Sequence, residues 1–131
     1  MKYNSALEVC ELACPDWVPI VESGNYDNPE SIAAVEMHVE ELLKFAPDKI
    51  ILGCTHYPYL MSLLTKFAPK ELFIDPAKIF VEYIKNDFES LGLLNNSQTA
   101  GYEKMFVSAN PESFTEHSKI FYELHKTPER A

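Results

Sequence analysis

Short apolar runs that alternate with amphipathic stretches constrain the fold of this chain more than any other feature of its sequence. The apolar runs are residues 7–14, 49–54 and 72–74, and stretches with apolar residues at three- and four-residue steps occupy 30–45, 58–67 and 76–91. Such runs are typical of buried strands, and such stretches are typical of helices with one buried face. Strands and helices in this order predict an α/β fold with a parallel sheet flanked by helices.

Proline, glycine and capping residues mark where these elements begin and end. Pro15 ends the first run, and a turn-rich passage follows at 16–30, within which residues 17–21 are expected to form a short helical piece. Asp75 and Pro76 read as an N-cap and a first helical residue, and Gly92 suits the C-terminal cap of the same helix. This last helix is predicted to bury Ala77, Phe80, Val81, Ile84, Phe88 and Leu91.

A polar break divides the chain. Residues 93–101 lack periodicity and read as a linker, after which 103–108 alternates like a strand and Asn110-Pro111 starts a helix. Phe114, Phe121 and Leu124 would form the apolar side of that helix. A single strand and helix cannot fold alone, so residues 93–131 are expected to dock on a sheet to which residues 1–92 do not contribute every strand.

The charge balance excludes several classes of partner. The chain has 131 residues, with 11 Lys and Arg against 20 Asp and Glu, for a net charge of -9. This charge repels phosphate backbones and anionic membrane surfaces, so nucleic acid and membranes are not expected as partners. The chain lacks an apolar run long enough to span a membrane and an apolar stretch near Met1 typical of a signal peptide, which predicts a cytoplasmic protein.

The strongest chemical signal lies at Cys54, at the end of the apolar run 49–54 and just before a predicted helix that has Pro58 in its first turn. Ligands of open α/β sheets bind at this end of the strands. Gly53 lets the backbone approach a ligand, and the N–H groups of residues 55–57 could hold a carboxylate. The positive end of the helix dipole would favour the thiolate, and His56 could carry a proton in the same crevice.

An alternative without chemistry carries similar weight on the residues alone. A cysteine at a strand end is commonly a small buried hydrophobe, and a histidine near a helix start is often only a cap. The other cysteines, Cys10 and Cys14, bring the number to three and have neither zinc-site spacing nor the density of a disulfide scaffold, which favours free thiols in a reducing compartment.

Three segments resemble one enzyme family. Leu52–Pro58 reads Leu-Gly-Cys-Thr-His-Tyr-Pro and resembles the second cysteine motif of glutamate racemases, members of the aspartate/glutamate racemase superfamily. Residues 13–24 resemble an upstream stretch of the same family, and residues 72–75 resemble the strand after the motif. The similarity continues to the final helix, so the chain is identified as the C-terminal half of a family member.

This resemblance implies a mechanism and its residues. Two cysteines on opposite faces of the α-carbon of glutamate exchange its proton, without a cofactor or metal, and the product D-glutamate enters peptidoglycan. By resemblance Cys54 is one of the two catalytic cysteines, Thr55 and His56 contact the substrate, His56 also assists proton transfer, and Glu22 is an auxiliary acidic residue. On the sequence alone, an exposed loop carboxylate is an equally good interpretation of Glu22.

The resemblance also implies that these 131 residues lack part of a family member. Family members are roughly double this length, and the other cysteine lies in a first lobe. Residues 1–92 would then form part of the second lobe, and 93–131 would be the linker and a strand–helix unit that returns to the first lobe. Cys10 and Cys14 lie in a strand of the same lobe as Cys54, so neither is expected to act as the opposing base, and Cys10 is interpreted as core.

Three functions follow in order of preference. The first is a glutamate racemase, with these residues inactive on their own. The second is a non-catalytic fragment that binds a small carboxylate or forms a homodimer through exposed apolar surface. The third is an aspartate racemase-like enzyme, which His56 disfavours because those enzymes usually carry another residue there.

Overall fold

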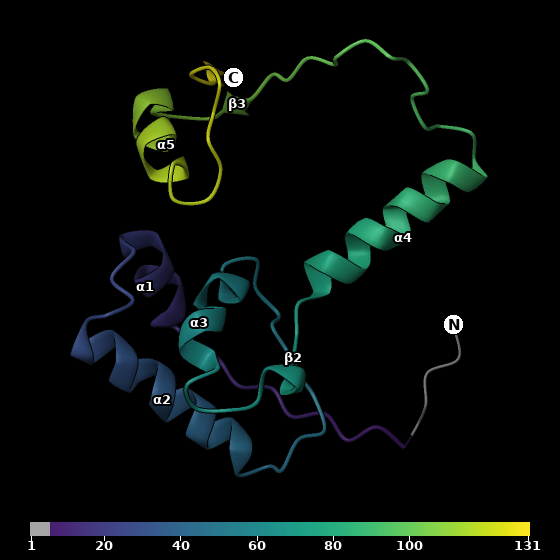
Figure 1. The fold of residues 1–131 in the computed structure, drawn as a ribbon. Coiled ribbons are helices and arrows are strands. Elements are labelled where there is room, and N and C mark those ends of the chain that lie inside the picture. The colour runs from purple at the N-terminus through teal and green to yellow at the C-terminus, as the bar shows by residue number, and fades with distance from the viewer. Residues whose placement is uncertain (1–5) are drawn as a thin grey trace. The chain divides into compact units, whose positions relative to one another are not determined.

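The computed structural model describes residues 6–131, and the chain divides into two compact units. The N-terminal unit runs from Met1 to Ile84 and the C-terminal unit from Lys85 to Ala131. Residues 1–5, where the sequence predicted no signal peptide, lie outside the described part. Figure 1 shows the order of the elements along the chain.

Three helices, two short strands and two 3₁₀ turns make up most of the N-terminal unit. In chain order they are α1 (Trp17–Ser23), α2 (Pro29–Leu43), β1 (Ile50–Ile51), the 3₁₀ turn η1 (Tyr57–Leu60), α3 (Met61–Leu64), the 3₁₀ turn η2 (Lys70–Leu72) and β2 (Phe73–Ile74). The boundary between the units falls inside the next helix, α4 (Pro76–Ser90). The C-terminal unit continues with β3 (Phe106–Val107), α5 (Pro111–Ser118) and β4 (Glu129–Arg130).

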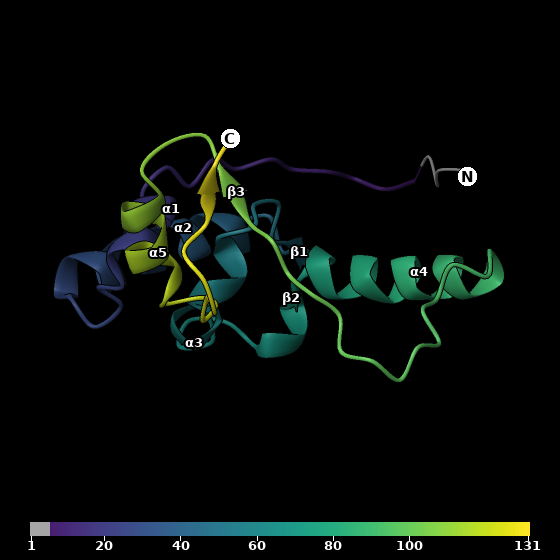
Figure 2. The ribbon, with the colours of Figure 1, turned by 90° about the horizontal axis from the view of Figure 1, so that it is seen from above.

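The β1 and β2 strands form a parallel pair, with Ile50 opposite Phe73 and Ile51 opposite Ile74 (Figure 2). The pairing extends one residue further, because the N–H of Leu52 donates to the carbonyl of Ile74 at 2.9 Å. Helices connect and flank these strands, so the predicted α/β class is confirmed. Because the strands are parallel, both carboxyl ends lie at the same edge of the sheet.

Helix α1 packs on η1 and on α2, and α2 packs on α3. The largest side chains in this core have less than 2% of their surface exposed: Trp17, Val21, Val35, Val39, Leu52, Leu60, Leu63 and Leu64. Each such aliphatic or aromatic side chain contributes about 1.5 to 3 kcal/mol when it leaves water. The core therefore joins the two helices to the segment that follows β1.

The ends of the first two helices follow local sequence signals. The side chain of Asn28 accepts a hydrogen bond from the N–H of Glu30 at 2.9 Å, and Pro29 occupies the first turn of α2. Gly24 ends α1 with φ of 68°, in the left-handed region that favours glycine. The predicted helical piece at residues 17–21 is confirmed as α1.

The predicted strand at residues 7–14 is wrong. The structure shows no regular secondary structure between Leu7 and Cys14, and Leu7 and Val9 are 69% and 76% exposed. Cys10 is also exposed, which overturns its interpretation as core. A strand needs a neighbour to satisfy its N–H and C=O groups, and in the described part of the chain no strand pairs with this segment.

Helix α4 begins and ends as predicted. The Asp75 carboxylate accepts a hydrogen bond from the N–H of Ala77 at 3.0 Å, and Gly92 follows the helix with φ of 67°. Its predicted burial is wrong, because Phe80, Val81 and the other apolar residues are exposed, and only Ile84 is half-buried. An amphipathic pattern shows which face a helix can bury, and a neighbouring element must then cover that face.

The C-terminal unit contains one strand that the sequence did not reveal. Strand β4 pairs in parallel with β3, with Phe106 opposite Glu129. The predicted strand at 103–108 thus has a partner within the chain. Helix α5 ends at Ser118, so Phe121 and Leu124 follow it instead of lying on it, and residues 93–101 contain neither helix nor strand.

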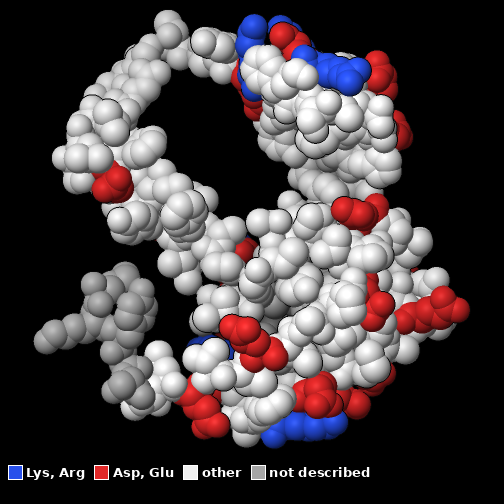
Figure 3. Space-filling view, turned by 180° about the vertical axis from the view of Figure 1, so that it is seen from behind, with Lys and Arg blue, Asp and Glu red and all other residues white. Residues whose placement is uncertain are grey.

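The chain has more acidic than basic residues, 20 Asp and Glu against 11 Lys and Arg. In Figure 3, Asp and Glu are spread over the face in view, while Lys and Arg form a few small groups. Within the described residues, every helix is too short or too polar to cross a membrane.

Candidate active site at the end of the first strand

Cys54 lies where the chain leaves the parallel sheet. Leu52 still bonds to β2 and is 1% exposed, whereas Cys54 two residues later is half-buried in a turn. The turn is closed by the N–H of Tyr57, which donates to the Cys54 carbonyl at 3.1 Å. The thiol therefore sits at the carboxyl edge of the sheet, where ligands bind in open α/β folds.

The helix expected after Cys54 is weaker than predicted. The segment is a 3₁₀ turn, η1, followed by the four residues of α3. The N–H of Tyr57 is already used by Cys54, so it is not available to a carboxylate as the sequence suggested. So short a helix also has few aligned peptide dipoles, and the side chains near Cys54 must account for most of its chemistry.

His56 lies between Cys54 and Glu22. Its Nδ1 is 3.9 Å from the Cys54 Sγ, at the long end for a hydrogen bond to sulfur, and its Nε2 is 3.5 Å from Glu22 Oε1. One ring nitrogen thus faces a thiol and the other faces a carboxylate. A carboxylate beside one nitrogen favours a proton there, which leaves the other nitrogen free to exchange a proton with the thiol.

Glu22 reaches this position from the last turn of α1. Trp17, Ile20 and Val21 bury the inner face of the helix, and Glu22 projects with 60% of its side chain exposed. It therefore lies on a helix, not in the loop that the alternative interpretation assumed. Thr55 is exposed in the turn, between Cys54 and His56.

A second layer of residues lies behind this group. The Tyr57 hydroxyl donates to the Cys14 carbonyl at 3.2 Å, and the Tyr57 ring meets Trp17 edge-on, with ring centroids 4.8 Å apart. Trp17 in turn meets the buried His38 ring at 5.9 Å. Nothing in the sequence predicted a role for these three aromatic side chains, although Tyr57 belongs to the cysteine motif.

Cys14 is unsuited to exchange protons at neutral pH. Its side chain is 3% exposed, and burial, followed by the nearby Asp16 carboxylate, raises the pKa of its thiol to about 11. The pKa of Tyr57 is also raised, first by burial and then by the charges that Cys14 and Cys54 would carry. Both groups stay neutral near pH 7 and can only donate or accept hydrogen bonds.

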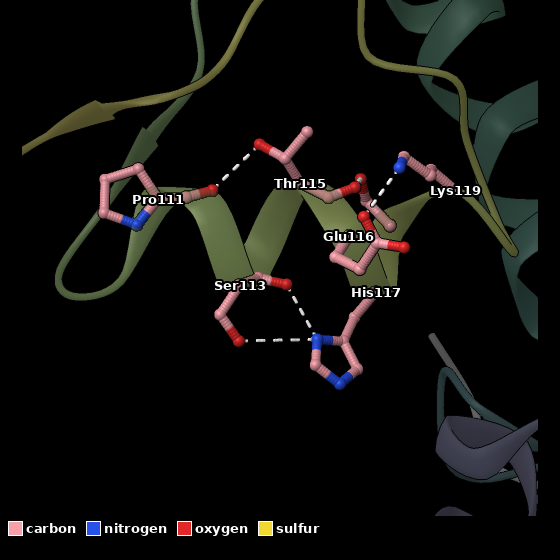
Figure 4. Close-up of polar contacts among 7 residues, drawn as sticks. Pro111, Ser113, Thr115, Glu116, His117 and Lys119 are labelled. Carbon is pink, nitrogen blue, oxygen red and sulfur yellow. Dashed lines mark hydrogen bonds and ion pairs between the residues drawn. The ribbon is translucent and has the colours of Figure 1, made fainter.

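A separate polar group on α5 has a structural explanation. His117 Nδ1 lies 2.7 Å from the Ser113 carbonyl and 3.5 Å from its hydroxyl, and Thr115 donates to the Pro111 carbonyl at 2.8 Å (Figure 4). Because Nδ1 must donate to the carbonyl, it cannot take a proton from Ser113. These bonds are contacts between residues four apart on one helix, and they explain this polar group.

Residues 6–131 contain no group of three or more His, Cys, Asp or Glu that could hold a metal ion.

Comparison with known proteins relates the chain to one family by similarity to individual members. No family model matches the chain. It is 30% identical over 119 residues to the glutamate racemase of Trichodesmium erythraeum and 34% identical over 119 residues to that of Chlorobaculum parvum. Each match covers 90% of this chain and 44% of the relative, so the chain spans less than half the length of these relatives.

Solved structures agree with this relationship. The glutamate racemase of Thermus thermophilus, in complex with beta-chloro-D-alanine, superimposes with a TM-score of 0.80 at 29% identity, covering 90% of this chain and 45% of that one. A glutamate racemase isoform of Bacillus anthracis shares the fold with a TM-score of 0.81 over 98% of this chain and 47% of its own.

Proposed function

We propose that this chain, a homologue of the glutamate racemases, supplies one of the two cysteine sites of a cofactor-independent glutamate racemase. The observation that carries the proposal is that His56 lies between Cys54 and Glu22 at the carboxyl edge of the parallel sheet. Its Nδ1 is 3.9 Å from the Cys54 Sγ, and its Nε2 is 3.5 Å from Glu22 Oε1. In this proposal the Cys54 thiolate removes the α-proton of glutamate, or its thiol returns one. His56 exchanges a proton with Cys54 through Nδ1, and Glu22 holds the ring orientation through Nε2.

The remaining parts of the proposal concern substrate and context. Thr55 and His56 would contact the glutamate, and the opposing thiol would come from the portion of a racemase that these 131 residues do not match. Residues 1–92 would form part of the second lobe, and residues 93–131 would form the linker and the strand–helix unit of the first. D-glutamate would supply peptidoglycan, and three free cysteines favour the reducing conditions of the cytoplasm.

A one-base exchange assay tests the Cys54 site without the second cysteine. The 131-residue chain is incubated with D-glutamate in deuterated water, and loss of the α-proton is followed by NMR while inversion is followed by circular dichroism. We expect slow exchange without inversion, because abstraction needs one base and inversion needs two. Cys54→Ala should abolish the exchange, and Cys10→Ala should leave it unchanged.

A fusion experiment tests the complete reaction. The chain is joined to the N-terminal portion of the Chlorobaculum parvum racemase, and racemisation is measured with and without Cys54→Ala. Positioning both cysteine thiols on the substrate lowers the activation barrier by roughly 7 to 11 kcal/mol. A fusion that completes the site should therefore raise the rate of racemisation by orders of magnitude. Exchange or racemisation that persists in Cys54→Ala would contradict the proposal.

The exposed apolar face of α4 favours a second candidate function. A non-catalytic homodimer would cover residues of this face such as Phe80 and Val81, which are 60% and 63% exposed. Absence of exchange together with stable self-association would support this candidate. An aspartate racemase-like activity ranks third, and the same assay with D-aspartate distinguishes it.

A further inference from the structure

Tyr57 connects three segments that form the candidate site. Its N–H donates to the carbonyl of Cys54, and its hydroxyl donates to the carbonyl of Cys14 at 3.2 Å. Its ring packs edge-on against Trp17 in the first turn of α1, with an interplanar angle of 72°. Glu22 lies at the other end of that seven-residue helix.

The contacts of Tyr57 connect the turn that carries the thiol and the imidazole to the helix that carries the carboxylate. Cys54 and His56 belong to the turn that Tyr57 closes, and Glu22 belongs to the helix on which its ring packs. Within this turn Thr55 is exposed and His56 has 34% of its side chain in solvent. The Cys14 carbonyl, by contrast, belongs to a residue that is 3% exposed and so offers a fixed anchor.

We propose that the Tyr57 hydroxyl is a positioning group, which by anchoring the Cys54–Tyr57 turn to the Cys14 carbonyl holds His56 between Cys54 and Glu22. This inference rests on the proposed function in one respect. The proposed function gives the arrangement of Cys54, His56 and Glu22 its catalytic purpose. The hydroxyl acts through His56 and does not touch the substrate.

Replacing the hydroxyl alone separates this role from ring packing. Tyr57→Phe keeps the ring against Trp17 and removes only the bond to the Cys14 carbonyl, so the chain should still fold, which far-UV circular dichroism verifies. One hydrogen bond of net strength near 1 kcal/mol alters a local equilibrium by about fivefold. Tyr102→Phe removes a hydroxyl from a residue that is 91% exposed and is the matched control.

The readout is the alkylation rate of Cys54 by iodoacetamide in the full chain, followed by peptide mass spectrometry, with exposed Cys10 as internal reference. The thiolate is the reacting form, so the rate near pH 7 reports how well His56 supports it. We expect Tyr57→Phe to slow Cys54 alkylation by about two- to tenfold at pH 7. The difference should vanish near pH 10, where hydroxide can deprotonate the thiol without help from His56.

Double variants decide whether the effect passes through His56. If it does, Tyr57→Phe should change nothing further in a His56→Ala background. A Tyr57→Phe rate equal to wild type at pH 7, a difference that persists at pH 10, or full additivity with His56→Ala would overturn the proposal. Because no glutamate is present, these outcomes are independent of whether the chain exchanges the α-proton.

Discussion

At the scale of single residues, the three cysteines differ by environment and not by chemistry. Cys10 is exposed in an irregular segment, Cys14 is buried, and Cys54 lies half-buried beside an imidazole. The sequence singled out Cys54 because of its place after an apolar run. The interpretation of Cys10 as core was wrong, because exposure depends on what packs over a residue and not on its neighbours in the chain.

The buried Cys14 thiol predicts a loss of stability at alkaline pH. Its pKa is raised from 9.0 to about 11, so the unfolded chain loses its proton first, and stability present below pH 9 falls as the pH rises toward 11. The loss is roughly 2 to 3 kcal/mol over this window. Urea denaturation at pH 8 and pH 11 measures it. Cys14→Ala should remove this part of the decline, and Cys10→Ala should retain it, so identical declines in both variants would refute the assignment.

At the scale of elements, helix ends follow local rules more closely than strands do. Asn28, Gly24 and Gly92 each occupy the cap position that their chemistry favours. Strand β4 and the unpaired segment at 7–14 were both misjudged, because a strand exists only where a distant partner satisfies its hydrogen bonds.

The Asn28 cap predicts a measurable cost for one substitution. Asn28→Ala leaves the N–H of Glu30 without its side-chain acceptor, which should lower the free energy of unfolding by about 1 kcal/mol. Asn28→Asp retains an acceptor oxygen and should stay close to wild type. Urea denaturation at neutral pH compares the three proteins, and equal losses in both variants would assign the effect to something other than the cap.

The exposed stripe of α4 predicts self-association. The rings of Phe80 and Tyr83 stack with centroids 6.5 Å apart and are both at least 60% exposed, so their burial between two copies would be favourable. Phe80→Ser should weaken association by about tenfold or more, since burying a phenylalanine contributes about 1.5 to 3 kcal/mol. Sedimentation velocity between micromolar and hundred-micromolar protein measures this, with the exposed Glu82→Gln as control. A wild-type chain that stays monomeric throughout would contradict the prediction.

At the scale of the whole molecule, the two units differ in how much they bury. Every fully buried large side chain of the described residues belongs to the N-terminal unit, whereas in the C-terminal unit only Pro128 is buried. Burial of apolar surface is the main stabilising term in folding, so the units should differ in stability.

Hydrogen exchange should reveal this difference. Amides of residues 35–39 and 60–64 open only with the N-terminal core, so we expect them to exchange at least about tenfold more slowly than amides of α5 and of the last turns of α4. Mass spectrometry of the chain in deuterated water at neutral pH measures both sets in one sample. Similar protection throughout would mean that the C-terminal unit is covered in solution, and dilution would then show whether a second copy covers it.

The sequence by itself determined the α/β class, the helices α1, α2 and α4, the caps of α4, and the cysteine at the carboxyl end of a strand. These depend on interactions within a few residues: the helical and strand periods, the geometry of proline and glycine, and the hydrogen bonds of capping side chains. The resemblance of residues 52–58 to one motif belongs to the same level, because a motif is a local property of the chain.

Only the tertiary structure decided which side chains meet. Glu22 reaches His56 from helix α1, and Tyr57 reaches the carbonyl of Cys14 across 43 residues of sequence. It also decided that α4 presents an apolar stripe to solvent and that residues 7–14 pair with no described strand. The physical reason is that periodicity specifies which face of an element can be buried, whereas burial and contact depend on the elements that fold against it.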